Sequence, residues 1–131
     1  MLVAVGDQHV RAALRLLLAR DPAFRVVGDS QDVTELLRDA AAAEPELVLL
    51  DGDLPGLLTG GAVAELRRLC PAAFIALSTR DEQRPRALAA GVAAFVGKSE
   101  PPARLLTVLR AAAPGQSPRA TTPPVVRPAS L

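Results

Sequence analysis

The chain is poor in aromatic and sulfur-containing side chains: its 131 residues include three Phe, no Trp, no Tyr, one Cys and one Met. A single cysteine excludes an internal disulfide and a zinc site made of cysteines. Because no aromatic side chains alternate with basic ones, we do not expect a surface that stacks the bases of single-stranded nucleic acid. The composition therefore predicts an aliphatic core and a reducing compartment, the cytoplasm.

Excess charge and long apolar segments are absent as well. The formal net charge is +1, from 15 basic and 14 acidic residues, which is too small for the electrostatic footprint of a nucleic-acid-binding surface. The first apolar run has no basic region before it and is interrupted at Asp7, so neither a signal peptide nor a membrane span is predicted. The length suits one domain, since a domain typically takes roughly 100–200 residues.

Short apolar runs alternate with amphipathic stretches along the chain. Four runs predict buried strands that end at a chemically useful side chain, over residues 2–5, 47–50, 74–77 and 93–96. A fifth run, Phe24 to Val27 before Gly28, ends at no comparable group and is predicted to form a flanking strand. Helical spacing of apolar residues predicts helices over residues 10–18, 33–40, 62–69 and 105–109. This alternation is typical of an α/β fold with a parallel sheet.

Four polar residues follow the four strand-like runs: Asp7, Asp51, Ser78 and Lys98. Because the carboxyl ends of parallel strands meet at one edge, where α/β proteins bind ligands, we expect these side chains to converge. Two neighbouring carboxylates repel each other, and a divalent cation bound by oxygen relieves the repulsion. Magnesium typically uses one or two protein carboxylates, so Asp7 and Asp51 are predicted to bind it, with the backbone carbonyl of Asp53 as a further ligand.

This combination of groups predicts phosphoryl transfer. With a cation in place Asp51 can attack phosphorus and form an aspartyl phosphate, and the Lys98 ammonium and the Ser78 hydroxyl supply donors to the transferred oxygens. Taken singly, an Asp before a Gly is most often a turn residue, and a lone Lys is most often a solvated charge. Four such residues at the same end of successive strands favour a functional site.

The motifs together resemble the receiver domain of two-component response regulators, over residues 1–113. They are Val5-Gly6-Asp7, the stretch 49–56 (Leu-Leu-Asp-Gly-Asp-Leu-Pro-Gly), the stretch 76–79 (Ala-Leu-Ser-Thr), and the stretches 90–92 and 95–98 (Ala-Gly-Val and Phe-Val-Gly-Lys). The resemblance implies a flavodoxin-like, doubly wound parallel sheet of five strands in the order 2-1-3-4-5, with helices on both faces.

The same resemblance implies a role for each site residue. Asp51 would accept a phosphoryl group from a histidine kinase, and Asp7, Asp51 and Asp53 would contribute to the magnesium site. Ser78 would follow the phosphoryl group and Lys98 would be its ion-pair partner. Phe95 would occupy the aromatic switch position, whose side chain turns inward when the hydroxyl moves.

Two segments are most similar to receivers that precede a helix-turn-helix DNA-binding domain: residues 98–102 with the helix after them, and residues 24–29. Residues 114–131 contain five Pro among small and polar residues and are expected to form a disordered tail or an interdomain linker. Any DNA contact would then come from a missing C-terminal effector domain. A homodimer is also expected, through the face of the fourth helix, the last strand and the last helix. Leu105, Leu109 and Arg110 are candidates for it, and core packing is expected to claim some of them.

Two departures from the receiver pattern bear on the magnesium site and on the fourth helix. Receivers usually present two adjacent acids after the first strand, and Gly6 stands in place of the first, which predicts weaker magnesium binding and slower phosphorylation. The segment from Ser78 to Gly91 is short and contains Pro85, so the fourth helix is predicted to be brief or to begin at Pro85. These departures leave open a degenerate receiver that acts without phosphate, as a dimerisation or ligand-binding module.

An enzymatic alternative comes from Asp51-Gly52-Asp53, which also resembles the first motif of haloacid-dehalogenase-like phosphatases. Those enzymes take further metal-binding acids from a strand after the lysine, whereas Glu100 is the only acid after Lys98 here. The receiver interpretation is preferred, and no enzymatic activity is expected.

Overall fold

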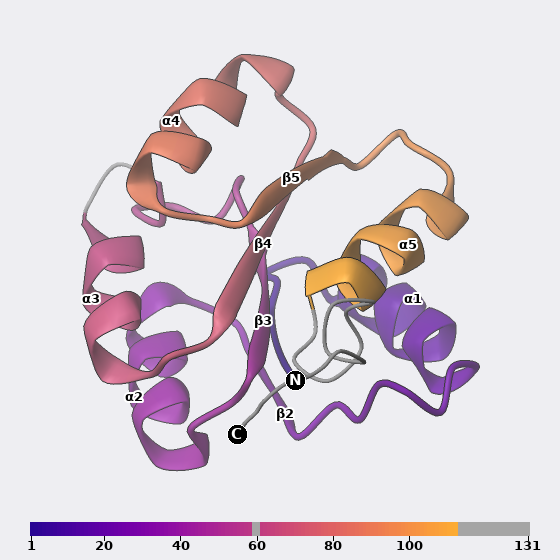
Figure 1. Ribbon diagram of the computed structural model, residues 1–131, viewed down its shortest axis with the longest axis horizontal. Helices are drawn as coiled ribbons and strands as arrows, with labels where there is room; N and C mark the ends of the chain where they lie inside the picture. Colours follow the sequence, from indigo (N-terminus) through magenta and orange to yellow (C-terminus); the bar gives the residue numbers. More distant parts are fainter. Residues whose placement is uncertain (59–60, 113–131) are drawn as a thin grey trace, which may run out of the picture.

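A computed structural model describes residues 1–58 and 61–112 of the chain, which contain one five-stranded parallel sheet (Figure 1). The strand order β2-β1-β3-β4-β5 confirms the predicted flavodoxin-like topology. The strands are β1 (Leu2–Ala4), β2 (Gly28–Ser30), β3 (Leu47–Asp51), β4 (Ala73–Ser78) and β5 (Ala94–Gly97). The helices are α1 (Gln8–Ala19), α2 (Val33–Ala43), α3 (Ala62–Leu69), the 3-10 turn η1 (Asp81–Gln83), α4 (Arg84–Ala90) and α5 (Pro102–Ala112). The predicted tail over residues 114–131 lies outside the described residues.

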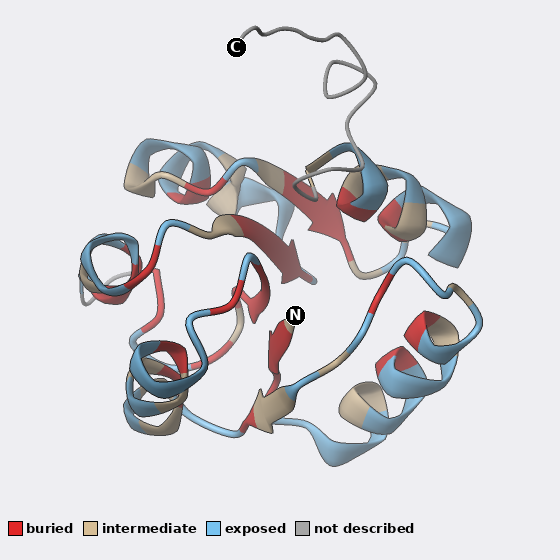
Figure 2. Ribbon diagram, turned by 60° about the horizontal axis from the view of Figure 1, so that its bottom comes forward, coloured by how far each residue is buried: buried red, intermediate tan, exposed pale blue. Residues whose placement is uncertain are grey.

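Helices cover both faces of the sheet: α1 and α5 lie on one side, and α2, α3 and α4 on the other (Figure 1). Successive strand residues point to opposite faces, so Val48 and Leu50 pack in the cluster with α2 and α3, while Leu47 and Leu49 pack in the cluster with α1 and α5. Figure 2 shows the result, with burial concentrated in the strands and on the helix sides turned toward them. Burial on both faces explains why the strands read as continuous apolar runs.

The position predicted for the flanking strand is wrong. Phe24 to Val27 is not a strand; β2 begins one residue later, at Gly28, which lies opposite Leu2 of β1. The Phe24 side chain is instead buried in the cluster with α1, and Val27 is more than half exposed, although its backbone N–H donates to the Met1 carbonyl at 2.9 Å. The apolar run over residues 24–27 therefore belongs to the segment between α1 and β2, which contributes Phe24 to the core. Strand β2, which pairs with β1, consists of Gly, Asp and Ser.

The short segment between β4 and β5 holds a brief helix, as predicted. Helix α4 has seven residues and carries Pro85 in its first turn, where the missing proline N–H has no helical acceptor to lose. It ends at Gly91, which has φ 114° and ψ 13° and donates its N–H to the carbonyls of Ala87 and Leu88. A positive φ of this size is open to glycine and strained for residues with a Cβ.

Replacing Gly91 with alanine is expected to lower the free energy of unfolding by about 1–2 kcal/mol, the cost of placing a Cβ in a left-handed conformation. Urea unfolding followed by far-ultraviolet circular dichroism measures the change. The matched control is Gly56→Ala, because Gly56 has φ 81° but no atom within 4 Å of the place a Cβ would take, whereas a Cβ on Gly91 would lie 2.7 Å from Arg67 Nη1. Equal losses would assign the cost to the backbone alone, and an unchanged stability of Gly91→Ala would contradict the prediction.

Candidate functional site

The polar residues expected at the carboxyl ends of the strands lie there in the structure. Asp51 and Ser78 are the last residues of β3 and β4, and Lys98 follows β5 directly. The register pairs Asp51 with Leu77, and Ser78 with Gly97, so the ends of these three neighbouring strands are nearly level. We call the edge formed by Asp7, Asp51, Asp53, Ser78 and Lys98 the acidic rim.

Lys98 bridges two carboxylates of the acidic rim. Its Nζ lies 2.9 Å from Asp51 Oδ1 and 2.9 Å from Asp53 Oδ2. The Asp51 side chain is only 6% exposed and the Lys98 side chain 18%, so both charges are largely removed from water. Burial opposes the charge on Lys98, but the hydrogen bonds to Asp51 and Asp53 outweigh it and raise the pKa of the lysine. The ammonium therefore stays charged and neutralises part of the acidic rim.

The Asp53 side chain has more hydrogen bonds than any other side chain of the acidic rim. Oδ1 accepts from the Ser78 hydroxyl at 2.8 Å, and Oδ2 accepts from Lys98 at 2.9 Å and from the N–H and hydroxyl of Thr79 at 3.1 and 2.9 Å. A turn closed by the Leu54 N–H and the Asp51 carbonyl directs Asp53 back over the strand ends. Burial opposes ionisation of Asp53, but hydrogen bonds from Lys98, Ser78 and Thr79 prevail and hold its pKa well below the usual range.

Asp7 serves as the N-cap of α1. Its Oδ1 accepts the backbone N–H groups of His9 at 2.8 Å and Val10 at 3.2 Å, which satisfies donors that have no partner inside the helix. The hydrogen bonds from Val10 and His9 lower the pKa of Asp7, and the charge of Lys98 lowers it further. Asp7 follows β1, whose last residue Ala4 pairs with Leu50 of β3, so Asp7 lies at the same edge of the sheet as Asp51.

Oδ2 of Asp7, Oδ2 of Asp51 and the backbone carbonyl of Asp53 receive no hydrogen bond from residues 1–58 and 61–112. This is the ligand set that the sequence predicts for magnesium, and oxygen is the ligand type that this ion prefers. No group of three His, Cys, Asp or Glu side chains suited to a metal occurs in the described part of the chain. The available set therefore consists of two carboxylates and one carbonyl, and both Asp53 carboxylate oxygens are taken by protein donors.

Ser78 connects the acidic rim to the start of α4. Its hydroxyl lies 2.8 Å from Asp53 Oδ1 and 2.7 Å from the side-chain amide of Gln83, and it accepts the Arg80 N–H at 3.0 Å. The Gln83 atom at this distance is Oε1, so Asp53 and Gln83 both present an acceptor to the single proton of the hydroxyl. Gln83 is the last residue of η1 and the next residue begins α4, which ties the position of α4 to Ser78.

Phe95, the predicted switch residue, is 3% exposed and points into the cluster that contains α4 residue Ala87. The Arg84 guanidinium lies 4.7 Å from the centre of its ring, and Arg84 Nη1 donates to the Phe95 backbone carbonyl at 3.1 Å. A charge placed over an aromatic face in this way is attracted to the ring. Contacts therefore run from Ser78 through η1 and the first residue of α4 to Phe95.

The sequence did not identify Thr79, Gln83 or Arg84 as part of this network. Thr79 directly follows Ser78 in the stretch 76–79, so its position along the chain indicates that it lies at the same strand end. Gln83 and Arg84 carry no such signal, because their contacts depend on how the short segment after β4 turns.

Of the three candidates for a dimer face, core packing claims two. Leu105 and Leu109 are 4% and 0% exposed and belong to the core cluster with α1. Arg110 is exposed, but its Nε donates to Asp21 Oδ2 at 2.8 Å, which ties α5 to the end of α1. The apolar stripe of α5 is used for packing within the domain.

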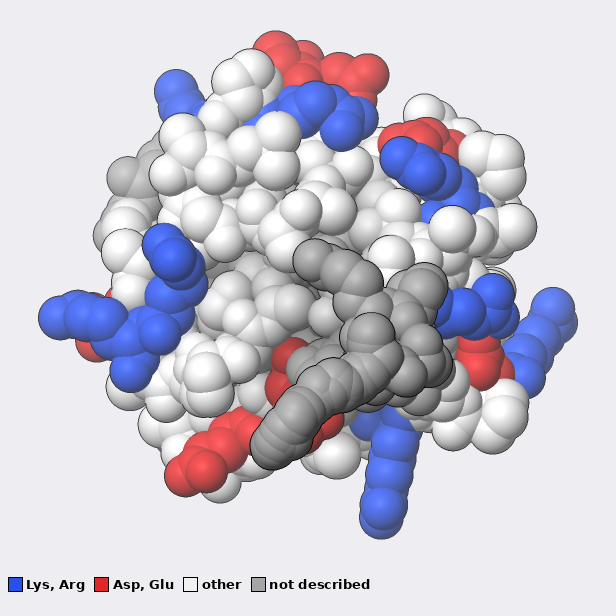
Figure 3. Space-filling view, viewed as in Figure 1, with Lys and Arg blue, Asp and Glu red and all other residues white. Residues whose placement is uncertain are grey.

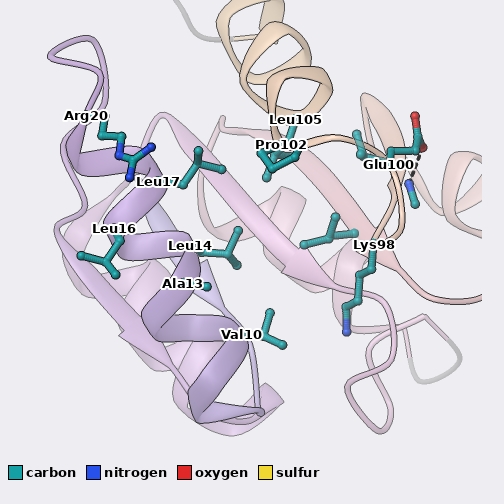
Figure 4. A pocket seen from close by; sticks show the side chains of 13 residues that line it. Val10, Ala13, Leu14, Leu16, Leu17, Arg20, Lys98, Glu100, Pro102 and Leu105 are labelled. Carbon is teal, nitrogen blue, oxygen red and sulfur yellow. Dashed lines mark hydrogen bonds between the residues drawn. The ribbon is translucent and has the colours of Figure 1, made fainter.

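An apolar pocket of about 480 Å³ opens next to the acidic rim, between α1 and α5. Figure 4 shows Val10, Leu14 and Leu17 of α1 facing Leu105 of α5, with Lys98 at one end. The charges on the face seen in Figure 3 lie around its margin with both signs mixed, and do not form a basic stripe. In the part of the chain that the structure describes, each helix is too short or too polar to cross a bilayer.

Residues 1–110 match the family model of the response regulator receiver domain, and the chain belongs to this family. Receiver domains pair with histidine kinases, bind Mg²⁺ at the phosphorylation site and are typically not enzymes themselves.

Known relatives carry different outputs. Over 118 residues the chain is 33% identical to a Pseudomonas aeruginosa protein named as a transcriptional regulator, covering 86% of this chain and 56% of that protein. It is 34% identical over 102 residues to a protein-glutamate methylesterase/protein-glutamine glutaminase of Symbiobacterium thermophilum, covering 75% of this chain and 28% of that protein. A LuxR-family two-component response regulator from Aurantimonas sp. SI85-9A1 superposes with a TM-score of 0.77 at 26% identity, covering 84% of this chain and 81% of that one. The chain thus spans about half or less of the length of these two curated relatives.

Proposed function

We propose that the protein accepts a phosphoryl group on Asp51 from a histidine kinase and passes the change to α4 and β5. The observation that carries the proposal is the state of the Asp51 carboxylate. It is buried at the end of a central strand, one oxygen is held by Lys98 and the Asp53 N–H, and the other receives no hydrogen bond from the described residues. A buried carboxylate oxygen without a donor is costly unless it serves a ligand or a reaction.

In the proposed reaction Asp51 Oδ2 attacks phosphorus. The bond from phosphorus to the histidine nitrogen of the donor breaks as the bond to Oδ2 forms. The donor ring, protonated on its other nitrogen, takes the electron pair of the broken bond and leaves as neutral imidazole. Lys98 and the Asp53 N–H hold the other oxygen of Asp51 and fix the direction of attack. Charge on the transferred oxygens needs donors nearby, and Lys98, Ser78 and Thr79 lie at the same strand ends.

Magnesium would be held by Asp7, Asp51 and the Asp53 carbonyl, and would supply positive charge that reduces the repulsion between the acids and the phosphoryl group. The absence of a second acid at Gly6 leaves this site with one carboxylate fewer than the family pattern. The proposed binding of magnesium is accordingly weak.

The switch would run through Ser78. Its hydroxyl contacts Gln83 just before α4, and Arg84 contacts Phe95, so a shift of Ser78 moves the start of α4 against β5. The chain would form a homodimer that responds to this shift. It would be located in the cytoplasm together with the kinase. Regulation of transcription would come through a C-terminal effector domain in a longer parent, by analogy with the relative named as a transcriptional regulator.

The substitution Asp51→Asn tests the proposal directly. Incubation of the wild-type chain with magnesium and acetyl phosphate is expected to add the mass of one phosphoryl group, whereas Asp51→Asn is expected to gain none. Intact-mass spectrometry measures both. The matched control is Asp29→Asn on the edge strand β2, where Asp29 pairs with the partly exposed Arg15, and it should label like the wild type. Equal labelling of Asp51→Asn, or no labelling of the wild type, would contradict the proposal.

The phosphatase alternative predicts a different result in the same preparation. A haloacid-dehalogenase-like enzyme would turn over a generic phosphate ester repeatedly, whereas a receiver would not. The receiver family match and the strand order favour the receiver.

A further inference from the structure

The Asp53 carboxylate is surrounded by donors that belong to neighbouring strands. Ser78 and Thr79 lie 25 and 26 residues away along the chain, and Lys98 lies 45 residues away. Together they give the two carboxylate oxygens four hydrogen-bond donors: a hydroxyl and an ammonium that the sequence assigned to the phosphoryl group, and the N–H and hydroxyl of Thr79. A side chain that only ended the turn after β3 would not need such a set.

These donors are also the ones that a phosphoryl group on Asp51 would need. Lys98 already contacts Asp51 at 2.9 Å, and the other donors lie beside it on Asp53. A phosphoryl group adds oxygens that carry about as much charge as a second carboxylate or more, and they require donors in the same place. Asp53 and a phosphoryl group therefore compete for one set of partners.

We propose that the Asp53 carboxylate is an internal anion that occupies the phosphoryl-binding donors and holds Ser78 and Phe95 in position without phosphorylation. This inference rests on the function proposed above, because it concerns how the same site is regulated. Phosphorylation of Asp51 must displace Asp53 from Lys98, Ser78 and Thr79. The protein consequently responds to phosphate less than a receiver with a neutral residue at this position.

The state of the switch residues agrees with this proposal. Ser78 is drawn to Asp53 at 2.8 Å, Phe95 is 3% exposed, and Arg84 lies over its ring. These contacts are made entirely by side chains of the chain itself. The charges agree as well: Lys98 is one cation between two carboxylates, so the acidic rim keeps a negative charge that repels an incoming phosphoryl group.

Two substitutions separate the charge of Asp53 from its hydrogen bonds. Asp53→Asn keeps the shape and one acceptor but removes the charge, and Asp53→Ala removes both. Because the chain has no Trp or Tyr for fluorescence, amide and aromatic NMR spectra of the full chain are the measurement. Asp29→Asn is again the matched control, with the same change of charge on the edge strand.

The first arm uses no phosphate analogue. Asp53→Ala is expected to shift the Thr79 amide, which loses its acceptor, and the Phe95 ring signals, while the signals of α1 and α2 stay in place and show that the fold is intact. Asp53→Asn is expected to give smaller shifts at the same positions. Unchanged Thr79 and Phe95 signals in Asp53→Ala would overturn the inference.

The second arm is a titration with beryllofluoride in the presence of magnesium. The half-saturating concentration is expected to be at least tenfold lower for Asp53→Asn than for the wild type and for Asp29→Asn. Equal or weaker binding by Asp53→Asn would overturn the inference and leave the proposed function intact. No binding by any of these proteins would overturn the proposed function, and the inference with it.

Discussion

Replacing Lys98 with methionine is expected to lower the free energy of unfolding at pH 7 by about 3 kcal/mol and to abolish labelling of Asp51 by acetyl phosphate. Methionine keeps the apolar stem of the side chain but removes the ammonium between Asp51 and Asp53. Breaking a buried ion pair from one side costs roughly 3–5 kcal/mol, and we take the lower end because the Asp53 side chain is 22% exposed. Urea unfolding followed by circular dichroism measures the loss.

The loss should depend on pH in a defined direction. The pKa of Asp53 is lowered in the folded chain, so the stability that its charge contributes is complete above its unfolded pKa of about 4 and disappears as the pH falls below it. The pKa of Lys98 is raised, so its contribution is complete below about pH 10 and is lost at higher pH. The difference between the wild type and Lys98→Met should therefore be largest near neutral pH and shrink below about pH 4.

The matched control for Lys98→Met is Arg104→Met. Arg104 is about half exposed and pairs with Glu100 at 3.4 Å, one turn away on the surface. Exposed pairs of this kind contribute about 0.3–0.5 kcal/mol. A loss for Lys98→Met as small as that of the control would show that the acidic rim does not depend on the ammonium.

Replacing Leu36 with alanine is expected to lower the free energy of unfolding by about 3 kcal/mol. Leu36 lies on α2, is 0% exposed and packs in the cluster between the sheet and α2, α3 and α4. The substitution removes buried methyl and methylene groups and leaves a cavity, and such changes cost about 2–5 kcal/mol. Urea unfolding measures the effect, and labelling of Asp51 in the folded protein should be unchanged because Leu36 lies in the apolar core and is not part of the acidic rim.

Leu16→Ala is the control for this change, since it deletes the same atoms from a side chain that is 70% exposed on α1. Its stability should stay within about 0.5 kcal/mol of the wild type. Comparable losses of unfolding free energy at Leu16 and Leu36 would contradict the prediction. They would show that the Leu16 side chain is buried in solution.

The central strands and their terminal polar residues could be predicted from the sequence because each signal is local. Strands β3 and β4 are apolar runs buried on both faces. The first polar residue after each run therefore identifies the residue at the carboxyl end of the strand. The edge strand was misplaced because Gly28, Asp29 and Ser30 carry no apolar pattern, and their strand character comes from pairing with β1. An edge strand pairs with a single neighbouring strand, so many different residue types can form it.

Asp53 shows a second limit of the sequence. Its position two residues after Asp51 suggested a backbone ligand for magnesium, whereas its side chain makes the contacts that define the acidic rim. That outcome depends on a turn that reverses the chain after β3 and on partners 25 and 45 residues away. Leu105 and Leu109 illustrate the same point on α5, because helical spacing identifies an apolar stripe but not the element that covers it.

Pro85 bears on how motion at Ser78 would spread. The proline ring fixes φ in the first turn of α4, immediately after the residues that contact Ser78 and Phe95. That stiff junction cannot absorb a displacement by unwinding, so a pull on Gln83 would tilt the seven-residue helix as one rigid rod. A shift of Ser78 at the strand ends would thus change the tilt of α4 relative to the sheet, and a protein surface that packs against α4 would sense that change.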